Sequence, residues 1–261
     1  MNVWIWGPPL WRLSHSISFL AKKQTAKIVS DFISTFSLVL PCKYCRKSFK
    51  HFFDIVNSAY GMSLTEVVNN HQLARWMYDI HELVNRKLER QTFLEQVEKV
   101  GDFCPHAQNL RGKRLSYDCL IKRHELHPVT VSPEDIFDIL FIFALNYPKN
   151  NSQKLKAYGT FLTNLLSIIY IFIENGDQLI PVSKNPFFKF FICMQKLHLQ
   201  YKIVPNEPPF KSKNEMFYYV FELWASFYNI TVLKNEKKYI KSLKLRYEVA
   251  KAAVCKHGSC K

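Results

Sequence analysis

The chain has 261 residues, of which 48% are hydrophobic, and this is enough to build a substantial core and to exclude an intrinsically disordered protein. Its seven glycines form neither a G-x-G-x-x-G nor a G-x-x-x-x-G-K-S/T motif, which argues against a dinucleotide-binding or P-loop α/β domain. The net charge of +15 is uneven, because nine Lys or Arg stand against two Glu in residues 234–261. Such a segment suits nucleic acid, anionic membranes or acidic proteins, and equally a solvated helix face.

Neither a secretory signal nor a membrane span is predicted. The N-terminal sequence MNVWIWGPPLW lacks the basic start and the small-residue cleavage site of a signal peptide. The longest apolar run, residues 161–173, includes Thr163, Asn164 and Ser167 and is shorter than the ~20 residues that cross a bilayer. We therefore expect a soluble protein.

Apolar residues recur at intervals of three or four in much of the chain, and alternating apolar stretches are scarce. This spacing is typical of amphipathic helices, so the sequence predicts an all-α fold. Pro41 is a helix-start signal directly before Cys42. In the first half, helices are predicted over residues 9–22, 26–39, 43–57, 70–90 and 92–100.

The second half continues the helical pattern. The run Ser132-Pro133-Glu134-Asp135 combines an N-cap residue, a proline in the first turn and two acidic residues ahead of an apolar helix. Residues 121–131 carry charges and a short β-branched stretch without helical periodicity, so we place a domain boundary there, between 1–120 and 121–261. Further helices are predicted over 152–174, 186–201, 212–229 and 234–254.

Cys42 and Cys45 form a CxxC pair at a predicted helix start, close enough to form a disulfide. The helix dipole and the adjacent Lys43 and Arg46 favour the thiolate, which is the form that attacks disulfides and electrophilic flavin carbons. A thioredoxin-type site would need a strand before the motif, whereas both flanks here are predicted to be helical. The pair is therefore a candidate redox centre beside a cofactor.

A zinc site is the alternative use of these cysteines. It would need two further ligands, although no second CxxC or C-x-x-H follows at a familiar finger spacing. On this alternative the chain is a basic, zinc-containing nucleic-acid-binding or assembly protein. The residues that could complete such a site are Cys104, His106, Cys255, His257 and Cys260.

Two aromatic segments flank the CxxC pair. Trp11 and His15 lie four residues apart on one predicted helix face, after Trp6 and Gly7. A second segment follows Trp76 and places an imidazole, an amide and apolar groups on one face. Each segment alone is also typical of a helical core, but together they fit a planar cofactor with a polar edge. The shared face of the second segment carries His81, Val84, Asn85 and Leu88.

The three motifs together resemble the Erv/ALR family of FAD-linked sulfhydryl oxidases over about residues 4–120. That family has W-x-x-x-H in its first helix, a CxxC opening a later helix, and a tryptophan followed by an H-N-x-V-N-x-K-L helix that grips the flavin nucleotide. Glu82 stands where the family commonly has Asn, and Arg90 where a Lys often follows. The residues that the resemblance assigns to FAD are Trp6, Gly7, Trp11, His15, Trp76, His81, Val84, Asn85, Lys87, Leu88 and Arg90.

The resemblance implies a thiol oxidase with Cys42 and Cys45 as its catalytic pair. A substrate dithiol would attack Cys42, expected to be the more accessible sulfur, and Cys45 would pass the electrons to FAD and on to oxygen, giving hydrogen peroxide. It also implies dithiol protein substrates and a homodimer, and argues against a nucleic-acid partner. A flavin-fold protein kept only as a structural module is a further alternative.

The resemblance also gives roles to two other cysteine pairs. Cys104 and Cys119 are similar to a structural disulfide of the family. Cys255 and Cys260, at the end of the sequence, are similar to a mobile second dithiol that carries electrons from substrates; a structural disulfide or free thiols are the alternatives. We recognise no family in the rest of the second half, and the composition resembles that of oxidases of large DNA viruses. A viral origin would place the protein in the infected-cell cytoplasm or the virion.

Overall fold

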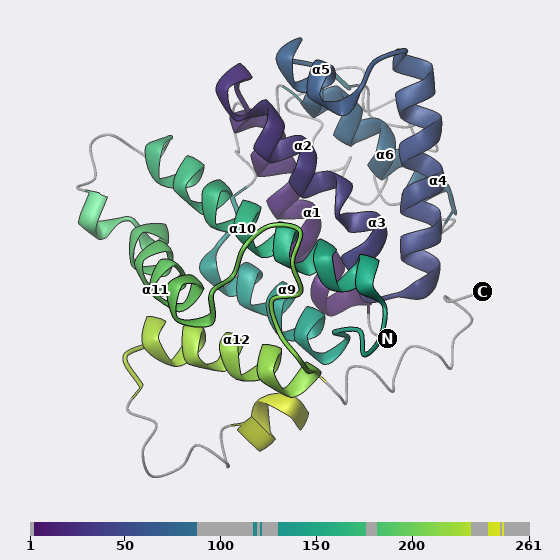
Figure 1. Cartoon of the computed structure of the whole chain (residues 1–261). Helices are drawn as coiled ribbons and strands as arrows, with labels where there is room; N and C mark the ends of the chain where they lie inside the picture. Colours follow the sequence, from purple (N-terminus) through teal and green to yellow (C-terminus); the bar gives the residue numbers. More distant parts are fainter. Residues whose placement is uncertain are drawn as a thin grey trace.

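The computed structural model describes residues 3–87, 117, 118, 121, 130–175, 182–230, 240–245 and 247. Within these residues every regular element is a helix, which confirms the all-α prediction (Figure 1). Several sequence predictions concern residues that lie outside the described ranges. They are the helix over 92–100, the contacts of Leu88 and Arg90, the disulfide Cys104–Cys119, and the dithiol Cys255/Cys260.

The first half contains a run of helices that follows the predicted pattern with several differences. Helix α1 begins at Val3 rather than at residue 9 and continues through Pro8 and Pro9, since Trp6 in its first turns is buried in the core. A break at Thr35, whose hydroxyl donates to the Phe32 carbonyl, divides the helix predicted over 26–39. The helices are α1 (Val3–Leu20), α2 (Ala26–Ser34), α3 (Phe36–Val39), α4 (Lys43–Tyr60), α5 (Leu64–Asn69) and α6 (Leu73–Lys87), with a short 3-10 turn, η1 (Lys23–Thr25).

Helix α5 is a further difference, because the sequence analysis did not predict it. A reciprocal cap starts this helix: the Ser63 hydroxyl accepts from the Glu66 backbone N–H, and the Glu66 carboxylate accepts from the Ser63 N–H. The helix predicted from residue 70 begins only at Leu73, because His71 has a left-handed backbone with φ of 58°. The Ser-x-x-Glu spacing was the signal in the sequence that could have found α5.

The second half forms helices close to their predicted bounds. The start predicted from Ser132 is confirmed, since its side chain accepts from the Asp135 N–H and Pro133 occupies the first turn. Residues 240–245 are helical, within the helix predicted over 234–254. The helices are α9 (Pro133–Leu145), α10 (Ser152–Glu174), α11 (Pro186–Tyr201) and α12 (Lys213–Phe227), with a 3-10 turn, η3 (Val182–Lys184).

The two halves share one hydrophobic core. Helix α1 packs along α9, and both α2 and α3 pack against α10. In Figure 1, α9 and α10 lie between the first-half helices and the pair α11 and α12. Arg12 on α1 also makes a two-point ion pair with Asp135 at the start of α9, in which Nε donates to Oδ2 at 3.0 Å and Nη2 donates to Oδ1. The division into domains at residue 120 stays a prediction, but the described helices on either side of it pack as one body.

Helix α10 is central to this core. By length and composition it is the one helix in the described part of the chain that could cross a membrane. Its apolar side chains are instead used in packing against α2 and α11. The buried residues are Ala157, Tyr158, Gly159, Phe161, Leu162, Leu165, Ile168, Ile169, Ile171 and Phe172.

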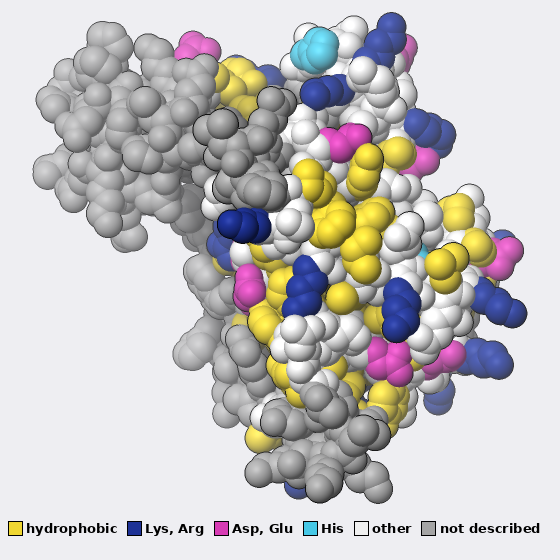
Figure 2. Space-filling view, turned by 90° about the vertical axis from the view of Figure 1, so that its left-hand side faces the viewer, with side chains coloured by type: hydrophobic (Ala, Val, Ile, Leu, Met, Phe, Trp, Pro, Cys, Tyr) yellow, Lys and Arg dark blue, Asp and Glu magenta, His cyan; other side chains and the backbone are white. Residues whose placement is uncertain are grey.

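On the face drawn in Figure 2, Lys and Arg side chains stand among apolar and uncharged groups rather than in a continuous basic stripe.

Replacing Gly159 by alanine tests how closely the chain approaches α10. A Cβ at this position would lie 2.7 Å from the Val204 carbonyl oxygen and closer still to that of Glu207. Because backbone must move to make room, Gly159→Ala is expected to lower the free energy of unfolding by about 1–3 kcal/mol, measured by urea denaturation. Gly61→Asn is the control, since Gly61 has nothing within 4 Å of such a Cβ and asparagine tolerates its left-handed φ. Equal stability of the two variants would contradict the close approach.

Candidate redox site on helices α1, α4 and α6

The CxxC pair lies at the start of α4, as predicted from Pro41. Cys42 is the N-cap residue, and its sulfur accepts a hydrogen bond from the Cys45 backbone N–H at an N···S distance of 3.4 Å. Arg46 Nη1 donates to the Leu40 carbonyl and, at 3.2 Å, to the Pro41 carbonyl. Both cysteines are thiols in this structure. Their spacing on one helical turn lets them form and break a disulfide without moving the helix.

The accessibility of the two sulfurs differs from the prediction. Cys42 is 8% exposed and belongs to the hydrophobic core, whereas Cys45 is half-buried. The reason is that Cys42 lies in the turn between α3 and α4, whose residues 39–42 are all buried, while Cys45 is one turn further on. The expectation that Cys42 is the more accessible sulfur is therefore wrong for the chain as described here.

The start of the helix also changes the acidity of Cys42. A hydrogen bond from the Cys45 side chain and the backbone N–H groups of Cys45 and Tyr44 lower the pKa of the Cys42 thiol to about 6, and burial opposes this shift. The pKa of Cys193 on α11 is shifted in the opposite direction, because burial raises it. These hydrogen bonds therefore favour the thiolate form of Cys42 in the reduced protein and make its sulfur a better leaving group from a disulfide.

The pH dependence of alkylation measures this difference. Because the thiolate reacts with iodoacetamide, the rate at Cys42 is expected to rise as the pH passes through about 6, against about 8.5 for an ordinary cysteine. The reduced protein would be alkylated without oxygen and the modified residues located by mass spectrometry. Cys193 is an internal control that should react only at higher pH. A midpoint near 8.5 for Cys42 would contradict the stabilisation of its thiolate.

The structure brings together the aromatic motifs that are far apart in the sequence. The Trp11 ring stacks on that of His81, with centroids 3.8 Å apart and planes inclined by 9°. His15 Nε2 lies 2.9 Å from His81 Nδ1, so one of these nitrogens donates to the other. This ring cluster of Trp11, His15 and His81 joins α1 to α6. Its rings are half-buried and could contact a planar ligand.

Helix α6 also connects the ring cluster to the CxxC helix. At one end Trp76 Nε1 donates to Asn57 Oδ1 on α4 at 2.8 Å. At the other end Lys87 Nζ donates to Ser48 Oγ, one helical turn after Cys45. These two bonds hold α4 and α6 side by side, and they place Lys87 near the redox pair. Asn57 and Ser48 have no motif around them, so sequence reasoning missed both.

The remaining predicted cofactor residues differ in how well they suit a ligand. Trp6 is 4% exposed, and its Nε1 has no hydrogen-bond partner among the described residues, so it is a buried donor that a bound acceptor could satisfy. Asn85 is 6% exposed and Val84 is half-buried on the same helix as His81. Trp76 is fully buried and its N–H is already used, while a Cβ on Gly7 would lie 3.0 Å from Val3 Cγ1. The geometry therefore gives Trp76 and Gly7 packing roles, and their contact with a cofactor stays a prediction.

The site has the groups that a flavin nucleotide requires. Aromatic rings can stack on its planar ring system, while the Trp6 indole, the imidazoles, Asn85 and Lys87 can serve its polar edge and phosphates. FAD thus fits the residues present.

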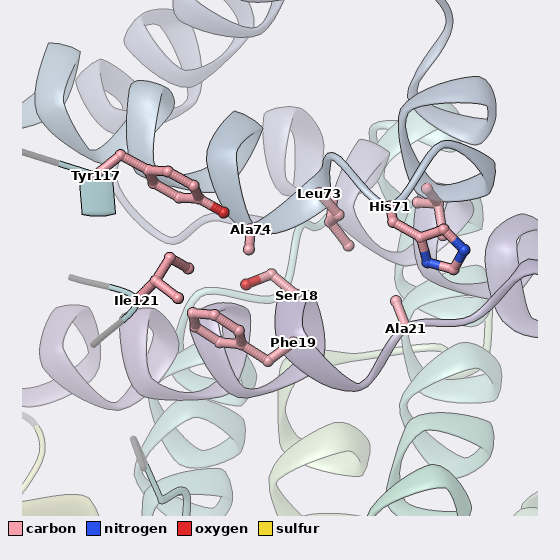
Figure 3. Close-up of a pocket in the computed structure, with 9 residues that line it drawn as sticks. Ser18, Phe19, Ala21, His71, Leu73, Ala74, Tyr117 and Ile121 are labelled. Atoms are coloured by element: carbon pink, nitrogen blue, oxygen red, sulfur yellow. The ribbon is translucent and has the colours of Figure 1, made fainter. Parts of the chain in front are cut away.

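A separate cavity lies beyond this site. It has a volume of about 260 Å³ and is bounded by the end of α1, the start of α6 and the short helical piece at Tyr117 (Figure 3). In the close-up, Ser18 and Phe19 of α1 lie opposite Ala74 and Tyr117. None of the residues predicted to bind a cofactor is among those lining it. The cavity therefore does not extend the candidate site.

The zinc alternative receives no structural support from the residues that can be described. Among them there is no group of three or more His, Cys, Asp or Glu side chains placed to hold a metal ion. The further ligands considered for Cys42 and Cys45 all lie outside the described ranges.

Comparison with known proteins shows which family the segment carrying this site is similar to. Residues 8–102, which include the CxxC pair and the helices on either side of it, match the Erv1 / Alr family, in agreement with the resemblance drawn from the sequence. Over 91 residues the chain is 30% identical to the mitochondrial FAD-linked sulfhydryl oxidase ERV1 of Saccharomyces cerevisiae. The aligned part is 33% of this chain and 44% of the yeast protein, so the chain spans less than half of that relative. No solved structure matches the chain.

Proposed function

We propose that this chain is an FAD-linked thiol oxidase in which Cys42 and Cys45 accept electrons from dithiol proteins. The observation that carries the proposal is the convergence of three helices. The CxxC pair begins α4, α6 is bonded to α4 one turn away through Lys87 and Ser48, and α6 meets α1 in the ring cluster. The family match of residues 8–102 supports the same conclusion.

The exchange step involves only sulfur atoms, those of the substrate dithiol and those of Cys42 and Cys45. In the oxidised protein, a substrate thiolate attacks the Cys42–Cys45 disulfide and forms a mixed disulfide, expelling the other sulfur as a thiolate. The second substrate thiolate attacks the mixed disulfide, which releases the substrate as a disulfide and leaves Cys42 and Cys45 reduced. Two electrons have then moved from the substrate to the pair, and the hydrogen bonds at the start of α4 stabilise the Cys42 thiolate that results.

The cofactor supplies the onward chemistry. When bound, FAD would supply the two-electron redox chemistry that links the reduced dithiol to oxygen and gives hydrogen peroxide. The residues that would hold it are the ring cluster, the buried Trp6 donor, Asn85 and Lys87. The family resemblance assigns substrate exchange to Cys42 and delivery to the flavin to Cys45. Cys45 is half-buried and packs against the core, so its proposed role towards the flavin rests on the family resemblance.

The proposal extends to residues beyond the described part of the chain. Cys255 and Cys260 would relay electrons from the substrate, Cys104 and Cys119 would form a structural disulfide, and the oxidase would be a homodimer. The compartment proposed from the viral resemblance is the infected-cell cytoplasm or the virion. Replacing Cys255 by serine should slow the oxidation of protein dithiols more than that of dithiothreitol if the relay exists.

Two measurements on the purified full chain test the central proposal. An absorption spectrum should show bound flavin, and oxygen should be consumed when dithiothreitol is added. A colourless protein that contains zinc would favour the nucleic-acid-binding or assembly alternative. A yellow protein that consumes no oxygen would favour a structural module that has kept the fold. Either result would overturn the oxidase assignment.

A further inference from the structure

We propose that Tyr158 on α10, outside the family-matching segment, is a positioning residue for the redox pair. Its hydroxyl donates to the carbonyl of Val39, the last residue of α3, at an O···O distance of 3.2 Å. Only Leu40 and Pro41 separate Val39 from Cys42. Helix α10 packs against α3, as Figure 1 also shows. The second half of the chain thus reaches the turn that presents Cys42.

The carbonyl groups of this turn are satisfied from two directions. Arg46, inside α4, donates to the carbonyls of Leu40 and Pro41, whereas the Val39 carbonyl accepts from Tyr158. Residues 39–42 are all buried, so a carbonyl that lost its donor would have little access to water. Tyr158 is therefore the one hydrogen-bond donor of this network that comes from the second half of the chain, whereas Arg46 belongs to the first half.

The environment of Tyr158 makes its hydroxyl a fixed neutral donor. The side chain is 2% exposed, and burial raises the pKa of its phenol above the ordinary value. The Phe143 carbonyl, at 3.4 Å, is a second acceptor for the same proton. The hydroxyl thus joins α10 to the end of α3 and to α9. Phenylalanine at this position would keep the ring packing and remove only the hydrogen bonds that the hydroxyl makes to the Val39 and Phe143 carbonyls.

The redox pair would respond to the loss of this link through the geometry of the turn. The low pKa of Cys42 depends on the sulfur lying where it accepts hydrogen bonds from Cys45 and Tyr44. If the Val39 carbonyl is freed, the turn before the N-cap relaxes and these hydrogen bonds to the sulfur weaken. The thiolate is then less stabilised, and the pKa of Cys42 moves up towards that of an ordinary cysteine.

The chain offers a matched control in Tyr147. This tyrosine is 5% exposed, its ring lies edge to face with that of Tyr158 at 5.0 Å, and its hydroxyl donates to the Phe210 carbonyl at 2.8 Å. The same hydroxyl also accepts from the Phe210 N–H at 3.2 Å, so Tyr147→Phe removes two buried hydrogen bonds from the same aromatic cluster. Their partner, Phe210, belongs to the segment before α12, not to the redox turn.

The test is the pH profile of Cys42 alkylation in the reduced protein, with Tyr158→Phe and Tyr147→Phe beside the unmodified chain. Tyr158→Phe is expected to raise the alkylation midpoint by about half to one pH unit, which is about a threefold to tenfold loss of thiolate below the pKa. Tyr147→Phe should leave the midpoint unchanged. Equal shifts in both variants, or no shift in Tyr158→Phe, would overturn the proposal. If a loss of folding obscures the result, the midpoints are read at a temperature where circular dichroism shows all three proteins folded.

The consequence for turnover rests on the proposed oxidase function, but the alkylation profile does not. Thiol reactivity is measured without flavin or oxygen. A protein that lacks oxidase activity but shows the midpoint shift in Tyr158→Phe would therefore contradict the proposed function and still support the positioning role. In an active oxidase, Tyr158→Phe should lower kcat/KM for dithiothreitol more than Tyr147→Phe does. If only Tyr158→Phe raises the alkylation midpoint but kcat/KM is equal in all three proteins, then Tyr158 positions the Cys42 sulfur without affecting turnover. That result would contradict the expected effect on turnover.

Discussion

Replacing Cys45 by serine is expected to abolish thiol oxidation while the protein still binds flavin. Without the second sulfur the pair can form neither the Cys42–Cys45 disulfide nor the dithiol that reduces FAD. Oxygen consumption with dithiothreitol should therefore fall by on the order of 10³-fold or more. The stacked rings of α1 and α6 and the buried Trp6 donor are unaffected, so the flavin absorption should persist.

Cys193→Ser is the matched control for this experiment. Cys193 lies on α11, is half-buried, and has no place in the redox site. Its replacement should leave oxygen consumption within about twofold of the unmodified protein. Turnover by Cys45→Ser at the level of Cys193→Ser would end the assignment of the CxxC pair as the redox centre.

The largest effect on stability is expected for Phe161→Ala. Phe161 on α10 is fully buried, and its ring packs on Phe32 of α2 with centroids 5.0 Å apart and on Phe143 of α9 at 5.2 Å. The residue thus fills the core that the two halves of the chain share. Removing its ring should lower the free energy of unfolding by about 3–5 kcal/mol, through lost burial and the cavity left behind. Urea denaturation followed by circular dichroism would measure this loss.

The same experiment tests whether the two halves unfold together. Because Phe161 contacts helices from both sides of residue 120, flavin fluorescence and circular dichroism should report one transition at a lower urea concentration. Phe191→Ala is the control, since Phe191 on α11 is only partly buried and packs against Tyr170 of the same half. Separate transitions, with flavin release unaffected by Phe161→Ala, would show that the first half is stable without the second.

Much of the local structure could be predicted because its causes are local. Repeats of apolar residues every three or four positions predict helices wherever they occur, and the caps at Cys42 and Ser132 fix two helix starts. The differences arise where packing competes with local preference. Helix α1 runs through Pro8 and Pro9 because Trp6 is buried against the core, and the left-handed His71 separates α5 from α6.

The site could be predicted only as a set of motifs. The spacing of Trp11, His15 and His81 indicated two polar faces on two helices, but their mutual stacking became visible only when α1 and α6 were packed together. The accessibility of the two cysteines was predicted in the wrong order, because the burial of Cys42 depends on how the turn before α4 is covered. No periodicity or motif pointed to Asn57 or Ser48, whose partners lie on another helix.

The sequence by itself determined the helical class, the CxxC pair as a candidate redox centre and the family that the motifs resemble, because periodicity, capping and motif spacing are properties of neighbouring residues. Only the tertiary structure decided that the second half belongs to the same core and that Tyr158 reaches the turn before Cys42. These contacts join residues more than a hundred positions apart. The physical reason is that burial and the pairing of buried polar groups depend on which helix faces meet, and single-chain patterns do not contain that information.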